Sequence, residues 1–443
     1  MQNLNSAVKS IIRAHSDYAF EFWLEEWETD FLRFFNSQTN YNITKTVKYV
    51  KASIVKDRKK YSFALSNPSE SDLYSAVNEG LELVEQLPED PDFVSFEDNK
   101  AIFEYPNFDS AIEKTPLEKK IDILEKISAM AAKYDFGIYG TFITLRERTV
   151  QINSNGLEKI HFSSPVMLDC KAVANKNMVT VINNYGGNSL ENLNLDRFIA
   201  ELEGRIKSAT LPVVDMEPGD YEVILSPLAT NELLQMLSYG AYADGLDSKE
   251  AFFEGKEGVK VFPESVTIAS LPQSDKVIRY GYNSDGHLAK PVTMVEKGVF
   301  KNFFVDNYYS HKLKMTKNGS VGNRALVMEP GDKTVEDMIK GVKKGLYISN
   351  LHYMNFINQK ETSVTGLTRD GSFLIENGKI VNVVNNLRFT EKIAEIFEQI
   401  TELENATHTI PVSGNYDDFS IFAAALPHVK TAKFKITSST HTI

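Results

Sequence analysis

The histidines of this chain are scattered, which limits the metal chemistry that neighbouring residues can support. A zinc-binding helix needs two histidines close together on one face, with a glutamate beside them. Here no two histidines are closer than 13 residues, so a sequence-local zinc helix is excluded. A site assembled from distant residues, for example around His287, His352 and Asp370, stays open as an alternative. The eight are His15, His161, His287, His311, His352, His408, His428 and His441.

The single cysteine offers little nucleophilic or redox chemistry. With Cys170 alone, neither an intramolecular disulfide nor a Cys-rich zinc or iron–sulfur site can form. Cys170 ends the apolar, strand-like run that begins at Val166. No base or helix N-terminus flanks it to lower the pKa of its thiol. The pattern therefore predicts a buried, inert side chain.

The most unusual local sequence runs from Thr365 to Ile380. It reads as a polar loop followed by a hairpin whose turn is Asn377-Gly378. Arg369 and Asp370 in the loop could contact a carboxylate or an amide of a ligand. The residues alone favour the other interpretation, in which the two form an internal ion pair that braces the turn.

The elements of the first half predict a mixed domain of helices and hairpins. Two alternating runs, from Asn42 to Ile54 and from Tyr61 onward, predict a hairpin with a charged turn near Asp57 to Lys60. Ser69 with Asp72 three residues later resembles a capping box and opens a helix. The acidic stretch from Glu85 to Asp98 is interpreted as an exposed connection rather than a cation site.

Further helices and one more turn complete this half. Thr115-Pro116 predicts an N-cap followed by proline at the first helical position. Asn155-Gly156 predicts a type I′ hairpin turn. Another helix follows Gly186-Gly187 and ends before Pro212. We therefore predict an N-terminal α+β domain over residues 1–211.

The second half is richer in strand and turn signals. We expect helices at about Pro227–Tyr242, Thr334–Lys344 and Thr390–Leu403, with strands between them. The prediction for residues 212–443 is a mainly antiparallel β domain, a curved sheet or partial barrel with inserted helices. The turn pairs are Pro218-Gly219, Asp285-Gly286, Asn318-Gly319, Pro330-Gly331, Asp370-Gly371 and Asn377-Gly378.

Charge and hydropathy exclude two classes of partner. The chain has 48 basic and 60 acidic residues, for a net charge of −12. Nucleic-acid binding by phosphate contact needs clustered Lys and Arg, so we expect no nucleic-acid partner. No run approaches the roughly 18 apolar residues of a membrane span. The N-terminus shows no apolar signal segment, so we expect a cytoplasmic protein with no membrane partner.

Several segments together resemble the TldD/TldE family, whose TldE member is also called PmbA and was historically labelled a modulator of DNA gyrase. The resemblance covers nearly the whole chain and is most specific after residue 212. The segments that carry it are Gly219–Pro227, Gly319–Arg324, Gly345–Ile348, Gly366–Gly371, Phe373–Ile380 and Asn386–Phe389.

The resemblance implies a two-domain fold and a dimer that encloses a cavity. TldD-type members resemble zinc peptidases, with a His-Glu-x-x-x-His helix and a cysteine ligand near the C-terminus. In this chain the matching positions hold Gln235, Met236 and Gly240, and the segment Ile410–Gly414 has no cysteine. Gln is a poor zinc ligand, Gly has no side chain, and Met cannot act as a general base. We therefore expect no cofactor or metal in this chain, and zinc in a TldD-type partner.

The expected function follows from the resemblance. The chain is similar to the TldE/PmbA-like subunit of a cytoplasmic metallopeptidase that acts on unfolded peptides or peptide precursors, and is expected to be inactive alone. The alternative is a non-catalytic, peptide-binding or structural homodimer. We expect no catalytic residue. The candidate peptide-binding residues are Gln235, Asn323, Arg324, Thr368, Arg369 and Asp370, each of which has a plain structural role in a turn as its alternative.

Overall fold

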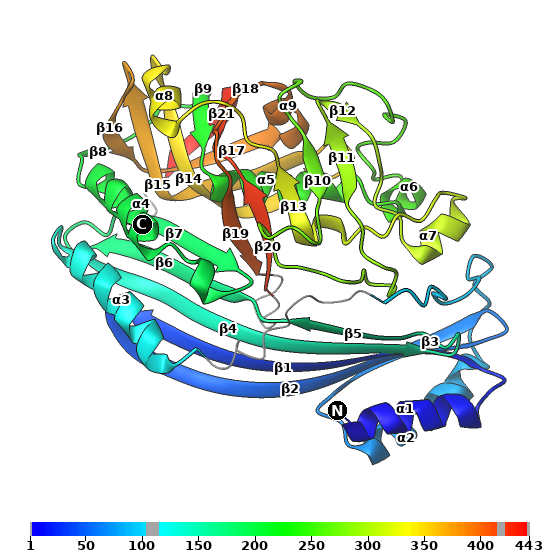
Figure 1. Ribbon diagram of the computed structural model, residues 1–443. Coiled ribbons are helices and arrows are strands. Elements are labelled where there is room, and N and C mark those ends of the chain that lie inside the picture. Colours follow the sequence, from blue (N-terminus) through cyan, green and yellow to red (C-terminus); the bar gives the residue numbers. More distant parts are fainter. Residues whose placement is uncertain (1, 103–114, 414–420, 441–443) are drawn as a thin grey trace.

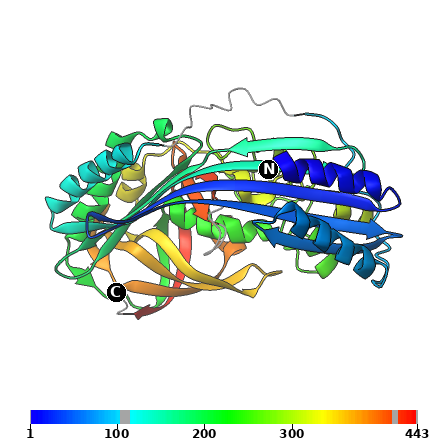
Figure 2. The same cartoon turned by 90° about the horizontal axis from the view of Figure 1, so that it is seen from below.

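The computed structural model describes residues 2–102, 115–413 and 421–440, and it is a layered α+β structure. The N-terminal half builds one curved antiparallel sheet, on which the C-terminal half rests (Figure 1). Seen from below, its longest strands run along most of the molecule (Figure 2). The strands of this sheet are β1 (Ala19–Phe35), β2 (Gln38–Lys56), β3 (Lys59–Ser66), β4 (Phe136–Asn153), β5 (Glu158–Ser163), β6 (Val166–Ala174) and β7 (Thr180–Gly187).

Four helices cover one face of this sheet, and the other face meets the C-terminal half. At one end, α1 (Gln2–Ala14) and α2 (Glu70–Val84) pack on the face that carries Phe20, Phe22 and Val50. At the other end, α3 (Leu117–Ala132) and α4 (Leu195–Ala209) pack in a core with Leu32 and Phe142, which lie on the same face as Phe20 and Phe22. Burial of each apolar stripe holds these helices in place.

Several predictions for this half are confirmed. The hairpin of β2 and β3 turns at Asp57 and Arg58, both with positive φ. A turn at Asn155-Gly156 connects β4 to β5 as expected, but Asn155 does not have the positive φ of the predicted type I′ turn. The capping box at Ser69 and Asp72 is present at the start of α2. The short helix η1 (Leu190–Asn192) precedes α4, which ends before Pro212 as expected.

Three expectations for this half were incomplete or wrong. The sequence reading missed β1, where Phe20, Phe22 and Leu24 alternate inward before charged residues interrupt the pattern. The helix α3 begins at Leu117, so Pro116 is itself the N-cap and no side chain caps the helix. The acidic connection is not exposed throughout, because Glu97 is 2% exposed.

The C-terminal half contains a small barrel. Strand β14 pairs with both β9 and β15, so the hydrogen-bonded path β14-β9-β21-β17-β15 closes on itself. The predicted partial barrel is therefore confirmed. The strands of this sheet are β8 (Val213–Val214), β9 (Gly219–Leu225), β14 (Lys344–Asn358), β15 (Ser363–Glu376), β16 (Lys379–Val384), β17 (Asn386–Lys392), β18 (Ile400–Leu403) and β21 (Val429–Thr440).

A third sheet lies beside the barrel, and α5 packs between the two. Leu233 and Leu237 of α5 share one apolar core with Val223 of β9 and Met328 of β13. The strands of this sheet are β10 (Ile268–Ser270), β11 (Val292–Glu296), β12 (Val299–Phe300), β13 (Leu326–Met328), β19 (His408–Ser413) and β20 (Ile421–Leu426). The helices of this half are α5 (Pro227–Tyr239), α6 (Asp244–Ser248), α7 (Asn307–Lys312), η2 (Gly322–Ala325), α8 (Val335–Lys340) and α9 (Ile393–Glu398).

The predicted helix over Thr390–Leu403 was wrong at both ends. The strand β17 continues to Lys392, and β18 begins at Ile400, which leaves only the short α9 between them. Pairing of β17 and β18 with β21 satisfies backbone groups that a longer helix would have used. The predicted domain boundary at 211/212 falls between α4 and β8, and the division into two domains stays a prediction. Among the described residues, no helix combines the length and apolar character that crossing a membrane requires.

Candidate functional site

A cavity of about 510 Å³ lies between the N-terminal sheet and the loops of the C-terminal half. One wall is the sheet itself, since side chains two residues apart on a strand point to the same face. The opposite wall consists of residues 242–244, 280, 282–284, 304–306, 309 and 320–324. The side chains of the strand wall are Trp23 and Glu25 of β1, Lys51 of β2, Glu147, Thr149 and Gln151 of β4, and Lys159 and His161 of β5.

The charged groups of the strand wall are mostly engaged with one another or with backbone. Lys51 donates to Glu25 at 3.2 Å, and burial raises the pKa of the Glu25 carboxyl despite this partner. Lys159 donates to the carbonyl oxygen of Gly286, and burial lowers the pKa of its ammonium group. Burial also lowers the pKa of His161 to about 4, so its imidazole is neutral at physiological pH. This wall is polar but nearly self-neutralised.

The turn at residues 319–324 forms the centre of the opposite wall. The Asn323 backbone N–H donates to the Tyr242 hydroxyl at 2.8 Å, and Gln235 of α5 donates to the Asn323 carbonyl oxygen at 3.3 Å. Gly322 has φ 62°, and a Cβ there would collide with the Tyr242 hydroxyl. Glycine at 322 therefore lets the turn approach Tyr242 closely enough for this contact.

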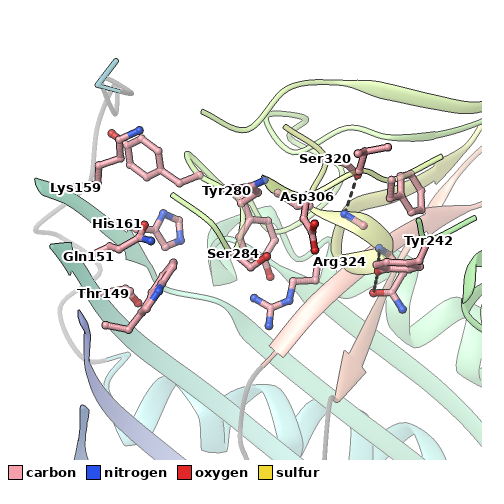
Figure 3. Close-up of a pocket in the computed structure, with 18 of the residues that line it drawn as sticks. Thr149, Gln151, Lys159, His161, Tyr242, Tyr280, Ser284, Asp306, Ser320 and Arg324 are labelled. Carbon is pink, nitrogen blue, oxygen red and sulfur yellow. Dashed lines mark hydrogen bonds between the residues drawn. The ribbon is translucent and has the colours of Figure 1, made fainter. Parts of the chain in front are cut away.

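Arg324 extends from this turn into the space between the two walls (Figure 3). Its guanidinium lies 6.0 Å from the ring centroid of Tyr280, which in turn stacks on His161 at 5.8 Å. Within residues 2–102, 115–413 and 421–440, this guanidinium has no hydrogen-bond or ion-pair partner. An unpaired guanidinium beside aromatic rings is suited to bind a carboxylate or a peptide carbonyl group.

The predicted peptide-binding residues fall in two separate places. Asn323 and Arg324 line the cavity, and Gln235 lies directly behind Asn323. Thr368 and Asp370, in β15, do not line it. Whether any of these residues binds peptide stays a prediction.

The second place is a closed contact between β15 and the N-terminal sheet. Asp370 is 3% exposed and accepts from Lys171 at 2.9 Å, Thr180 at 3.0 Å and Asn350 at 3.0 Å. Thr368 is fully buried, and its hydroxyl accepts from the Leu387 backbone at 3.0 Å. The ion pair of Asp370 is with Lys171 and not with Arg369, so the expected internal partner was wrong.

The helix α5 carries the three positions that the resemblance places at the metal site. Gln235 is occupied by its bond to the Asn323 carbonyl oxygen, and Met236 packs partly buried against the core. Gly240 caps the helix, and a Cβ there would lie 2.8 Å from the Phe252 Cβ and 3.3 Å from the Leu237 carbonyl oxygen. No side chain fits at 240 without movement of the neighbouring chain, so this helix cannot supply a ligand there.

Sequence reasoning missed most of the cavity. His161, Tyr280 and Lys159 gave no motif, because they become neighbours only when two halves of the chain meet. The alternation of Glu147, Thr149 and Gln151 is the one local signal of a polar face that could have been followed. Cys170 is fully buried, and burial raises the pKa of its thiol, which agrees with the predicted inert side chain.

Comparison with known proteins places the C-terminal half in one family. Residues 218–438 match the family described as the PmbA/TldA metallopeptidase C-terminal domain. A relative called a metalloprotease, from Methanothermobacter thermautotrophicus, is 23% identical over 216 residues. That match covers 46% of this chain and 47% of the relative, so the chain aligns with about half of that relative's length.

Two further comparisons extend over more of the chain. A zinc metalloprotease TldD homolog from Saccharolobus solfataricus is 24% identical over 359 residues, which is 72% of this chain and 76% of the relative. The crystal structure of TldE from Thermococcus kodakarensis superposes with a TM-score of 0.86 over 98% of this chain and 100% of that one, at 18% identity. That likeness establishes the fold. The match over residues 218–438, together with the curated relatives, shows that the chain belongs to the TldD/PmbA family.

Proposed function

We propose that this protein is a TldE/PmbA-like, cytoplasmic subunit of a TldD/TldE-type metallopeptidase, and that it contributes peptide binding rather than catalysis. Its substrates would be unfolded peptides or peptide precursors. A TldD-type partner chain would supply the zinc and its ligands.

The observation that carries the proposal is the chemistry of α5. Gln235, Met236 and Gly240 provide neither the two imidazoles nor the carboxylate that activation of a zinc-bound water requires. Position 240 also lacks the space for any ligand. Among the described residues that line the cavity, His161 is the single histidine, and it is neutral and buried.

Peptide binding is supported by the cavity and by one edge of the sheet. Arg324 could hold a peptide carboxylate or carbonyl oxygen, while Tyr242 and Tyr280 offer aromatic surface to side chains. In the described structure, residues 38–47 of β2 pair with β1 alone, because the pairing of β2 with β3 begins at Tyr49 and Asn67 bonds the backbone of Lys48. That edge leaves backbone groups to which an extended peptide or a partner strand can add.

The decisive experiment is to purify the tagged chain from its native cell and identify what accompanies it. We expect a chain with a His-Glu-x-x-x-His motif, and peptidase activity on an unfolded peptide from the complex but not from this chain alone. Mutation of the partner's motif should abolish the activity. Peptidase activity of this chain in isolation would contradict the proposal.

The alternative is a peptide-binding or structural homodimer that acts without a catalytic partner. Light scattering of the pure chain, alone and mixed with the candidate partner, separates the two. A homodimer that survives mixing and never associates with the partner would favour this alternative.

A further inference from the structure

A cluster of two histidines and one glutamate lies outside the cavity, where three segments of the chain meet. Glu404 follows β18, His408 begins β19, and His428 lies between β20 and β21. Each offers one ligand atom, and these atoms all lie within 4.8 Å of one another. None of the three residues lines the cavity around Arg324, and none belongs to the segments that carry the family resemblance.

The carboxylate of Glu404 is the centre of the cluster. His428 Nδ1 lies 2.6 Å from Glu404 Oε2, and His408 Nε2 lies 2.9 Å from the same oxygen. The His428 backbone N–H also donates to this oxygen at 3.1 Å, which fixes the carboxylate. Glu404 and His428 are 7% and 5% exposed, whereas the side chain of His408 is 16% exposed.

The geometry points to a binding site for one Zn²⁺ ion, held by Glu404, His408 and His428. Two imidazole nitrogens and a carboxylate oxygen are a donor set that Zn²⁺ uses when a fourth position holds water. Ligand atoms around a tetrahedral zinc stand about 3.3 Å apart, so the nitrogen-to-oxygen distances must widen by roughly half an ångström. The exposed edge of His408 gives an ion access from solvent and leaves the fourth position for water.

The residues behind the cluster are placed to orient its ligands. The Tyr347 hydroxyl lies 3.0 Å from His428 Nε2, so it can accept from that nitrogen when Nδ1 binds metal. Glu201 of α4 lies 3.9 Å from His408 Nδ1 and would accept from this second imidazole after an approach of roughly 1 Å. Partners of this kind fix the ring orientation of metal-bound histidines and raise their basicity.

Two arginines lie near the cluster within the described residues: Arg205, whose charge acts on His428 and Tyr347, and Arg197, which is paired with Glu201. Arg197 Nη2 lies 3.2 Å from His408 Nδ1, while its Nε donates to Glu201 at 2.7 Å. When His408 binds metal through Nε2, its Nδ1 carries the hydrogen, so Arg197 must release that nitrogen and keep its pair with Glu201. The site thus exchanges two N–H···O bonds for three metal–ligand bonds.

The test uses the full chain, free of any histidine tag and stripped of metal with a chelator. Zn²⁺ is then titrated against a chromogenic competitor, and Co²⁺ absorption reports the coordination geometry. We expect one equivalent of Zn²⁺, a four-coordinate Co²⁺ spectrum, and thermal stabilisation by Zn²⁺. His408→Ala should weaken the affinity at least about 100-fold, and Glu201→Gln roughly tenfold.

Matched variants keep the test decisive. His311→Ala removes an exposed histidine of α7 and should leave zinc binding unchanged. His408→Ala removes a partly exposed ring, and its circular dichroism should match the parent chain. Equal zinc binding by the parent and His408→Ala would overturn the site. Absence of stoichiometric zinc binding by the parent would also overturn it, and would show that the three residues form a hydrogen-bonded cluster only. Neither result bears on peptidase activity in the partner complex.

Discussion

The N-terminal sheet meets the C-terminal half in two contrasting places. At one, around Arg324, a cavity separates the two halves, and a guanidinium extends into it without an anionic partner among the described residues. At the other, around Asp370, a buried carboxylate accepts three hydrogen bonds and its Lys171 ion pair closes the contact. The guanidinium at the first place is available to bind a ligand, whereas the carboxylate at the second is fully used in internal hydrogen bonds.

The difference shows that a conspicuous motif and an available side chain are separate properties. The Gly366–Gly371 segment belongs to the most specific match in the sequence, yet it lies within β15 rather than in a loop, and Asp370 is directed into the protein. Asp370 has a φ of 54° at an irregularity in the pairing of β15 with β14, and its carboxylate accepts from Lys171. The less conspicuous turn ending in Arg324 presents its side chain to the cavity.

The largest expected effect is at the closed contact. Asp370→Ala should lower the free energy of unfolding by about 2–4 kcal/mol, because Lys171, Thr180 and Asn350 all lose their acceptor. Urea denaturation of parent and variant measures this loss. Peptide affinity of the folded variant should be unchanged. If Asp370→Ala were as stable as the parent but defective in peptide binding, Asp370 would have a binding role and not a structural one.

At the cavity the expectation is the opposite. Arg324→Ala should weaken binding of an unfolded peptide about 10- to 100-fold, since it removes a charge-assisted hydrogen bond, while stability changes by less than about 0.5 kcal/mol. Fluorescence anisotropy with a labelled peptide measures the affinity, in the partner complex if the chain alone binds weakly. Arg324→Lys keeps the charge and should recover part of the loss. Unchanged affinity in both variants would remove Arg324 from the site.

Local signals predicted much of the fold, because caps and turns act over a few residues. The capping box of Ser69 with Asp72 and Pro227 at the start of α5 are confirmed in this way, as is the position, though not the type, of the turn at Asn155-Gly156. The sequence reading missed Glu97, whose partners His287 and Lys317 lie about 200 positions along the chain. The sequence of an acidic stretch does not show which of its carboxylates will be buried and paired with a distant lysine.

The cavity was harder to predict for the same reason. Its walls join β1, β2, β4 and β5 to loops beyond residue 240, so no window of sequence contains the site. Asn323 and Arg324 were found through the resemblance. His161 and Tyr280 had no signal, since a stacked pair depends on packing between the two halves.

A third test asks whether a buried carboxylate beside the cavity, that of Glu21, lowers the stability of the fold. Burial, reinforced by the charge of Asp285, raises the pKa of Glu21 beside the cavity from its ordinary 4.5 to about 7. Between pH 4.5 and 7 the folded chain holds a proton that the unfolded chain has released, so the stability contributed by Glu21 falls as pH rises through this range.

Glu21→Gln removes this titration and keeps an oxygen that accepts from Gln151, which now donates to Glu21 at 3.0 Å. The variant should be about 1–2 kcal/mol more stable than the parent at pH 8, after allowance for partial exposure, and nearly equal to it at pH 4. Urea denaturation across pH 4–8 checks both values. Lower stability at pH 8 would show that the carboxylate supports the cavity.

The smallest expected effect comes from Arg369, one residue from Asp370 in sequence. Its half-buried side chain forms no hydrogen bond or ion pair with any described residue, and it does not line the cavity. Arg369→Ala should therefore change both stability and peptide affinity by less than about 0.5 kcal/mol. Arg369→Ala is the matched control for Arg324→Ala, because each variant removes one guanidinium and both are measured with the same peptide. An equal loss of affinity in the two variants would mean that peptide reaches both places, and that the closed contact opens when it binds.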